Sequence, residues 1–169
     1  MSPRRIGVIS DTHMFSRGKA LPKALAEGLA GVDLLLHAGD FTDPAVIPLL
    51  EAIAPIEAVA GNNDGADIIN RFGYRKIVEV SGFRIGLVHG HQGPGRSTEW
   101  KAFHSFRDEE VDAVVFGHSH QPHYEIIDGI LLFNPGSPTD KRFQPKYSYG
   151  IIELGERLRA AHFYYEDKS

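Results

Sequence analysis

The side chains of this sequence that could do chemistry stand directly after its apolar stretches. Seven of them carry an oxygen or nitrogen donor: Asp11, His13, Asp40, Asn62, His89, His118 and His120. Carboxylate and imidazole donors together are typical ligands of divalent transition metals. Taken singly, each of these residues also has an interpretation without a metal. Asp11 could cap a turn, Asn62 could hold a tight turn and His89 could be a loop imidazole. Their repetition at successive strand ends favours a metal site.

These donors need a scaffold that brings them together, and the first half of the chain predicts one. Apolar runs at 5–10, 34–37 and 56–60 predict buried strands. Apolar residues at helical spacing predict a helix over 21–29 and another that begins at Asp43-Pro44, because an acceptor followed by proline favours a helix start. Alternating strands and helices imply parallel strands, and ligands bind at the carboxyl edge that such strands share.

The second half of the chain predicts hairpins. Strands are expected at 76–80 and 84–88, at 123–127 and 130–133 around Asp128-Gly129, and at 147–154 and 159–165, with a further buried strand at 113–116. Ser97 or Thr98 can cap a short helix whose aromatic residues could form a lid or a partner surface, although their helical spacing favours the core: Trp100, Phe103 and Phe106. We expect residues 1–169 to form one α/β domain, with a parallel half followed by a mainly antiparallel half.

The number of donors favours two metal ions over one. Seven donors exceed the needs of one ion, whereas two ions about 3.5–4 Å apart that share a carboxylate would use them well. Asp40 is the expected shared ligand, because a carboxylate has two oxygens and its charge offsets the repulsion between the ions. The chain has no cysteine. Donors without sulfur suit Mn²⁺, Fe²⁺, Co²⁺, Ni²⁺ or Zn²⁺.

Five short motifs carry a resemblance to a known family. Asp-x-His at 11–13, Gly-Asp at 39–40, Gly-Asn-x-Asp at 61–64, His-Gly-His at 89–91 and Gly-His-x-His at 117–120 occur in that order. In this order they resemble the calcineurin-like metallophosphoesterase superfamily. The short length and the Asn-Pro-Gly-Ser segment at 134–137 are similar to its small bacterial and archaeal phosphodiesterase branch (YfcE-type).

The resemblance implies a fold, a ligand set and an activity. The fold would be a four-layer αββα sandwich of two packed mixed sheets, with a di-metal site at the carboxyl edge of the strands. One ion would be held by Asp11, His13, Asp40 and His120, and the other by Asp40, Asn62, His89 and His118. The activity would be that of a phosphodiesterase that hydrolyses small phosphodiesters or nucleotides with two divalent ions, foremost Mn²⁺. The alternatives are a phosphomonoesterase and a non-catalytic scaffold protein of the same fold.

The sequence departs from this family at the position that follows the metal-binding asparagine. Many relatives carry histidine there to protonate the leaving group, whereas this chain has Asn63. We take Asn63 and His91 as the candidate catalytic residues; His91 either protonates the leaving group or supports the ligands. No arginine lies within the motifs. Lys141 and Arg142 could meet a substrate phosphate, although a solvated pair of charges is the more ordinary interpretation.

Composition narrows the remaining function classes. The formal net charge is −4, which argues against a strong nucleic-acid surface. The apolar run near the amino end is too short to span a membrane. We therefore expect a cytoplasmic enzyme whose partner is a small phosphoester, with a homodimer or higher homo-oligomer compatible with its aromatic residues. The loops at 14–19 and 92–96 are expected to set the size of the substrate.

Overall fold

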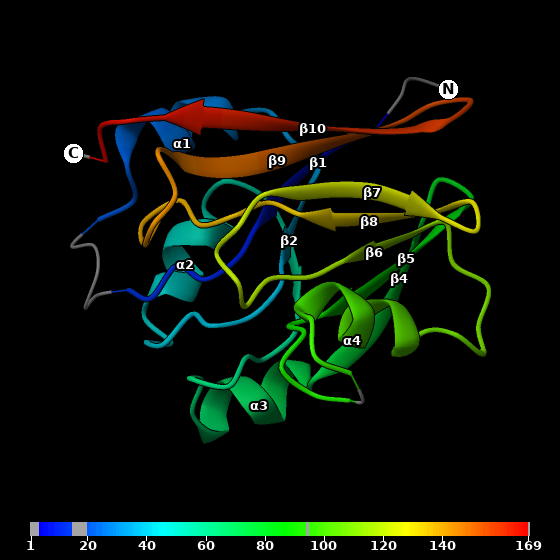
Figure 1. Ribbon diagram of the computed structural model, residues 1–169. Coiled ribbons are helices and arrows are strands. Elements are labelled where there is room, and N and C mark those ends of the chain that lie inside the picture. Colours follow the sequence, from blue (N-terminus) through cyan, green and yellow to red (C-terminus); the bar gives the residue numbers. More distant parts are fainter. Residues whose placement is uncertain (1–3, 15–19, 94, 169) are drawn as a thin grey trace.

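The computed structural model describes residues 4–14, 20–93 and 95–168 (Figure 1). The expected size-selecting loops, 14–19 and 92–96, lie partly outside these residues. In chain order the elements are β1 (Arg4–Ile9), α1 (Lys23–Gly28), β2 (Leu34–His37), α2 (Val46–Glu51), β3 (Ile56–Ala58), α3 (Ala66–Phe72), β4 (Arg75–Val80), β5 (Phe83–Val88), α4 (Thr98–His104), β6 (Ala113–Val115), β7 (His123–Ile127), β8 (Ile130–Asn134), β9 (Tyr147–Leu154) and β10 (Leu158–Tyr165). Among the described helices, none is long and apolar enough to cross a membrane.

The strands form two mixed sheets of five. The first sheet has the order β10-β9-β1-β2-β3 and the second the order β4-β5-β6-β8-β7. Strands β1, β2 and β3 are parallel, as expected. The second half is mainly antiparallel, as expected, because the hairpins β4–β5, β7–β8 and β9–β10 pair antiparallel, although β5, β6 and β8 are parallel neighbours. The last hairpin does not join the second sheet, since β9 pairs with β1 in the first sheet.

Three apolar layers join the sheets and helices. Leu25 of α1 and Leu50 of α2 belong to the cluster on the outer face of the first sheet. Ile6 of β1 and Ile85 of β5 meet between the sheets. Phe106, which follows α4, packs on the outer face of the second sheet. The expected four-layer αββα sandwich is therefore confirmed, with helices on both outer faces (Figure 1).

The sequence of β1 shows why this strand is buried on both faces. Successive side chains of a strand alternate between its faces. Ile6 and Val8 accordingly point between the sheets, and Ile9 points to the helical layer. Gly7 shares the face of Ile9, and a Cβ atom there would lie 2.6 Å from Leu29 Cδ2. Glycine thus lets the loop after α1 pack closely on the central strand.

Several local expectations differ from the structure. Helix α2 begins at Val46 because the Asp43 side chain accepts the N–H of Ala45, which makes a turn before the helix. Helix α3 was not expected at all, although Ile68 and Phe72 are buried at helical spacing and Gly73 ends the helix. The amino-terminal cap of α4 is Ser97, which was one of the two expected caps. Trp100, which was expected in the core, is 48% exposed.

Candidate metal centre

The predicted donors converge at one edge of the sandwich. Each follows the carboxyl end of a parallel strand: Asp11 and His13 after β1, Asp40 after β2, Asn62 after β3, His89 after β5, and His118 and His120 after β6. Two groups of side chains place their donor atoms within 4.8 Å of one another. These groups are Asp11, His13 and His120, and Asp11, Asp40 and His89. The first sheet supplies both carboxylates and the second sheet supplies three of the histidines.

Two carboxylates lie between the histidines. Asp40 Oδ2 is 3.3 Å from His13 Nε2 and 3.4 Å from His89 Nε2. Asp11 Oδ1 is 3.6 Å from both His89 Nε2 and His120 Nε2. Asp40 Oδ2 therefore lies between histidines of the two sheets, and its role as a ligand shared by two ions stays a prediction. Asp11, expected at one ion only, occupies a comparable central position.

The two histidines of the Gly-His-x-His motif point to different neighbours. His118 Nδ1 lies 3.2 Å from Asn62 Oδ1 and 3.3 Å from His89 Nε2. The His120 ring is instead 5.0 Å from the ring of His13, measured between centroids. His118 thus lies beside Asn62 and His89, and His120 lies beside His13; the assignment of these ligands to two ions stays a prediction. Each side of the centre receives one histidine of the pair.

The backbone of the centre is held in an unusual conformation. Five of the seven predicted ligands have positive φ angles: Asp11 (55°), His13 (44°), Asp40 (63°), His118 (73°) and His120 (60°). Non-glycine residues adopt such angles rarely, and the cost is on the order of 1 kcal/mol each. Gly61 allows close approach, because a Cβ atom there would lie 2.1 Å from Asp40 Oδ1. Strained backbone concentrated in this way is typical of functional sites.

Hydrogen bonds fix the orientation of two of the histidine rings. His89 Nδ1 lies 2.8 Å from the carbonyl oxygen of Ala38, to which it donates. His120 Nδ1 makes the same kind of bond to the carbonyl oxygen of Asp140. In both residues Nε2 is left to face the carboxylates. Metal-binding histidines are commonly oriented in this way.

The residues around Asn62 hold Asp40 in place. Asn63 donates its backbone N–H to Asp40 Oδ1 and its side-chain amide to Asp40 Oδ2, both at 2.9 Å. The Asp64 carboxylate accepts the N–H groups of Asp40 (2.8 Å), Gly61 (2.7 Å) and Thr42 (2.9 Å). Asn63 therefore acts on Asp40 in this structure, and Asp64 ties together the loops that follow β2 and β3.

The segment after β8 braces the centre, a role that sequence reasoning missed. Ser137 Oγ donates to the carbonyl oxygen of Asp11 at 2.7 Å, and Thr139 Oγ1 donates to that of Thr12. Asn134 Nδ2 donates to the carbonyl oxygen of Gly117 at 3.1 Å. The Asn-Pro-Gly-Ser segment served only as a family marker in the sequence. Its hydroxyl and amide side chains are the feature of the sequence from which these bracing hydrogen bonds could have been predicted.

The electrostatics of the centre favour a cation. Burial would raise the pKa of Asp40, but contacts with His13 and His89 outweigh it and hold that pKa well below its usual range. Burial would lower the pKa of His13, but Asp11 and Asp40 raise it to about 9. Among the described residues, Asp11 Oδ1 and His120 Nε2 are buried without a hydrogen-bond partner. Divalent cations fit this donor set, because they would satisfy both atoms and balance the carboxylates.

The other histidine of the His-Gly-His motif lies beside the centre. The His91 ring is 5.3 Å from the ring of His89 and 5.6 Å from that of Tyr74, between centroids. These residues line a pocket of about 50 Å³ together with Arg75 and Ser105. Burial, and next the nearby His89, lowers the pKa of His91 to about 4. His91 is therefore placed to act at the site, in an environment that disfavours its protonation.

The histidine before Gly-Asp is a structural residue. His37 is fully buried and stacks on Phe41, with ring centroids 3.6 Å apart. Its Nδ1 accepts the N–H of Gly39 at 3.1 Å, so Nε2 carries the proton that is shared with Thr12 Oγ1 at 3.2 Å. Burial lowers the pKa of His37 to about 3. Structural support, the favoured sequence interpretation, agrees with these contacts.

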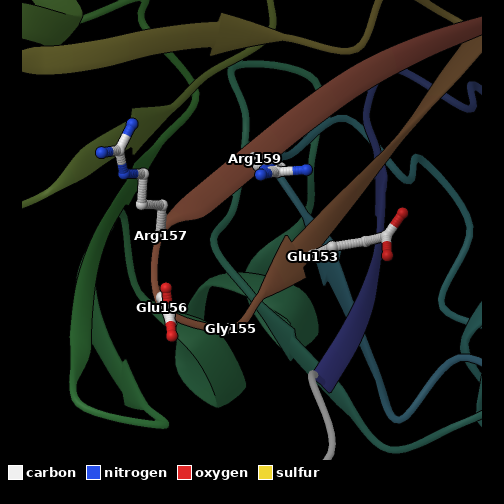
Figure 2. A pocket seen from close by; sticks show the side chains of 5 residues that line it. All are labelled: Glu153, Gly155, Glu156, Arg157 and Arg159. Carbon is white, nitrogen blue, oxygen red and sulfur yellow. The ribbon is translucent and has the colours of Figure 1, made fainter.

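A larger hollow lies at the opposite end of the first sheet. It has a volume of about 400 Å³ and is lined by charged residues from the turn end of the β9–β10 hairpin, shown in Figure 2: Glu153, Glu156, Arg157 and Arg159. Leu154 pairs with Arg4, at the amino end of β1, whereas Asp11 follows its carboxyl end. This hollow is therefore separate from the candidate centre.

An αββα sandwich that carries carboxylates and histidines on its strand ends defines a metallophosphoesterase fold. Residues 5–157 match the Calcineurin-like phosphoesterase superfamily domain. The chain belongs to the calcineurin-like phosphoesterase superfamily, whose members include metal-dependent hydrolases of phosphoric esters.

Individual relatives agree with this assignment. A probable metallophosphoesterase from Methanothermobacter thermautotrophicus is 38% identical over 159 residues, covering 92% of this chain and 89% of its own. A protein of Methanocaldococcus jannaschii named a phosphodiesterase is 31% identical, covering 78% of this chain and 82% of its own. The structure of Vps29 from Entamoeba histolytica complexed with zinc has a TM-score of 0.77 at 21% identity, covering 95% of this chain and 98% of that one. This last likeness concerns the fold.

Proposed function

We propose that this protein is a divalent-metal-dependent phosphodiesterase that hydrolyses small phosphodiesters or nucleotides at a binuclear centre. The observation that carries the proposal is the position of Asp40 Oδ2, 3.3 Å from His13 Nε2 and 3.4 Å from His89 Nε2. A carboxylate oxygen between two imidazoles from different sheets suits a ligand shared by two ions. The relative named a phosphodiesterase supports diesters as the substrate class.

Different residues of the chain would have different roles in this reaction. Ions bound here would supply a water of lowered pKa and stabilise charge on the phosphoryl oxygens. His13, His89 and His120 present Nε2 toward the centre. Asn63 fixes both oxygens of Asp40, so the shared ligand keeps one orientation. Mn²⁺ is the expected ion, and Zn²⁺ is the alternative supported by the zinc complex of the Vps29 neighbour.

The environment of the leaving group predicts a preference among substrates. The side-chain amide of Asn63 donates a hydrogen bond to Asp40 and cannot act as an acid. The pKa of His91, about 4, disfavours a proton on that ring at neutral pH. Substrates whose leaving group needs no proton, such as nitrophenyl diesters, are therefore expected to react faster than alkyl diesters. His91 remains the candidate for what protonation there is.

The direct test compares a diester with a monoester. We expect hydrolysis of bis-p-nitrophenyl phosphate with Mn²⁺, loss of that activity with EDTA, and slower hydrolysis of p-nitrophenyl phosphate. Faster hydrolysis of the monoester would make the protein a phosphomonoesterase. If neither ester reacts with Mn²⁺, Zn²⁺, Ni²⁺ or Co²⁺, a scaffold protein of the same fold becomes the better description.

A further inference from the structure

The turn that follows the bracing segment carries two cations beside the candidate centre. The N–H of Gln144 donates to the carbonyl oxygen of Lys141 at 2.9 Å, so Lys141 to Gln144 form a turn with Arg142 at its first central position. The preceding residue, Asp140, accepts the Nδ1–H of His120 through its carbonyl oxygen. Two residues of chain span at most about 7 Å. Arg142 is thus anchored within side-chain reach of the centre.

The two cations of this turn differ in their surroundings. Lys141 Nζ lies 5.6 Å from the centroid of the Tyr147 ring, over which it packs. Arg142 is exposed, and no ion pair with it is found within 4–14, 20–93 and 95–168. Of the two cations, Arg142 is therefore the more exposed one beside the centre, whereas Lys141 packs over an aromatic ring.

The backbone of Arg142 supplies a second, independent observation. Its φ angle is 49°, in the region where glycine is favoured, and primed turns prefer glycine at this position. A long charged residue is therefore placed where the turn alone would favour the smallest one. Strain of this kind is retained where the side chain has another use.

We propose that Arg142 binds a non-bridging oxygen of the substrate phosphoryl group and so determines the affinity of the site for phosphoesters. A guanidinium suits this task because its fork of N–H groups matches two phosphate oxygens. The motifs themselves contain no arginine, so Arg142 provides the cationic group that they lack. This inference rests on the proposed function, since it concerns the same site.

The test uses the Mn²⁺-loaded protein with inorganic phosphate as the probe, measured by calorimetry, and bis-p-nitrophenyl phosphate as the substrate. Arg142→Ala should weaken phosphate binding about tenfold or more and lower kcat/KM comparably, chiefly through KM. Lys141→Ala, the matched control, should change both by less than about twofold. The affinity for Mn²⁺ should be unchanged in both variants, which a structural role for Arg142 would not allow.

Arg142→Gly separates binding from folding. Glycine relieves the strained φ angle, so the Tm should be at least that of the wild type while phosphate binding is lost. Equal phosphate affinity in Arg142→Ala and the wild type, or an equal loss in Lys141→Ala, would overturn the inference. If the wild type hydrolyses nothing yet binds phosphate through Arg142, the inference stands and the phosphodiesterase proposal fails.

Discussion

Asp64 accepts the backbone N–H of Asp40 at 2.8 Å, across 24 residues of sequence. The same carboxylate accepts the N–H groups of Gly61 and Thr42, so one buried side chain sets the spacing between two loops. One loop carries the expected shared ligand, Asp40, and the other carries Asn62. The geometry of the candidate centre therefore depends on a residue that contributes no donor to it.

Asp64→Asn should lower both stability and metal affinity. An amide keeps one acceptor oxygen but turns an NH₂ group toward an N–H donor, which should cost about 1–2 kcal/mol of unfolding free energy. The affinity for Mn²⁺ should fall because Asp40 and Asn62 lose their fixed spacing. Urea unfolding and Mn²⁺ titration measure the two effects. Asp67→Asn, an exposed carboxylate on α3, is the control and should change stability by about 0.5 kcal/mol or less.

Asp40→Asn should abolish most of the activity and the binding of at least one ion. The amide removes the negative charge that two cations would share, while it preserves the size of the side chain. Metal content after gel filtration and turnover of bis-p-nitrophenyl phosphate are the measurements. Asp11→Asn is the variant for comparison, because Asp11 Oδ1 also lies in the middle of the donor atoms. Two bound ions and full activity in Asp40→Asn would assign the bridge to another residue.

His37→Gln should reduce the dependence of stability on pH. His37 has a folded pKa of about 3 and an unfolded value near 6.5, so the unfolded state binds the extra proton between these values. Stability is therefore fully present above about pH 6.5 and falls by about 1.4 kcal/mol per pH unit below it. Between about pH 7.5 and pH 5, the variant should lose about 2 kcal/mol less than the wild type.

The measurement for His37 is urea unfolding of the metal-free protein in EDTA, so that competition between protons and ions does not contribute. The variant is expected to be the less stable protein at neutral pH, since the stack on Phe41 is lost. The decisive quantity is the change with pH in each protein. Parallel loss in both would show that His37 is not the titrating group.

His91→Ala separates the two candidate roles of that residue. If His91 supports the ligand His89, turnover should fall by a similar factor for nitrophenyl and alkyl diesters, and Mn²⁺ affinity should fall with it. If His91 protonates the leaving group, the alkyl diester should lose far more activity than the nitrophenyl diester. The low pKa of His91 favours the first pattern. Unchanged turnover of the alkyl diester would remove the acid role.

The sequence predicted the donors because a strand end is a local feature. An apolar run followed by Asp11 or His89 is visible without knowledge of any partner strand. Since parallel strands place their carboxyl ends at one edge, convergence followed from strand order alone. The resemblance to the family then supplied the division into two groups, and the structure shows His118 near Asn62 and His120 near His13.

The pairing of distant segments could not be obtained in the same way. The sequence of β9 does not indicate that this strand pairs with β1. Hydrophobic alternation indicates which face of a strand is buried, but not which strand lies beside it. The bracing by Ser137 and Thr139 likewise joins segments that lie more than 120 residues apart in the sequence. Helix α3 has only a short apolar face, so its sequence resembles that of a loop. The structure shows what this face packs against, since Phe72 stacks on Phe41.

The position of β9 beside β1 also has a consequence for protein synthesis. A ribosome delivers Asp11 and His13 early, but the hydroxyl groups of Ser137 and Thr139 that secure this loop are delivered more than 120 residues later. Strand β9 follows them. A growing chain therefore exposes these donors well before the segment that holds their loop in place has been synthesised.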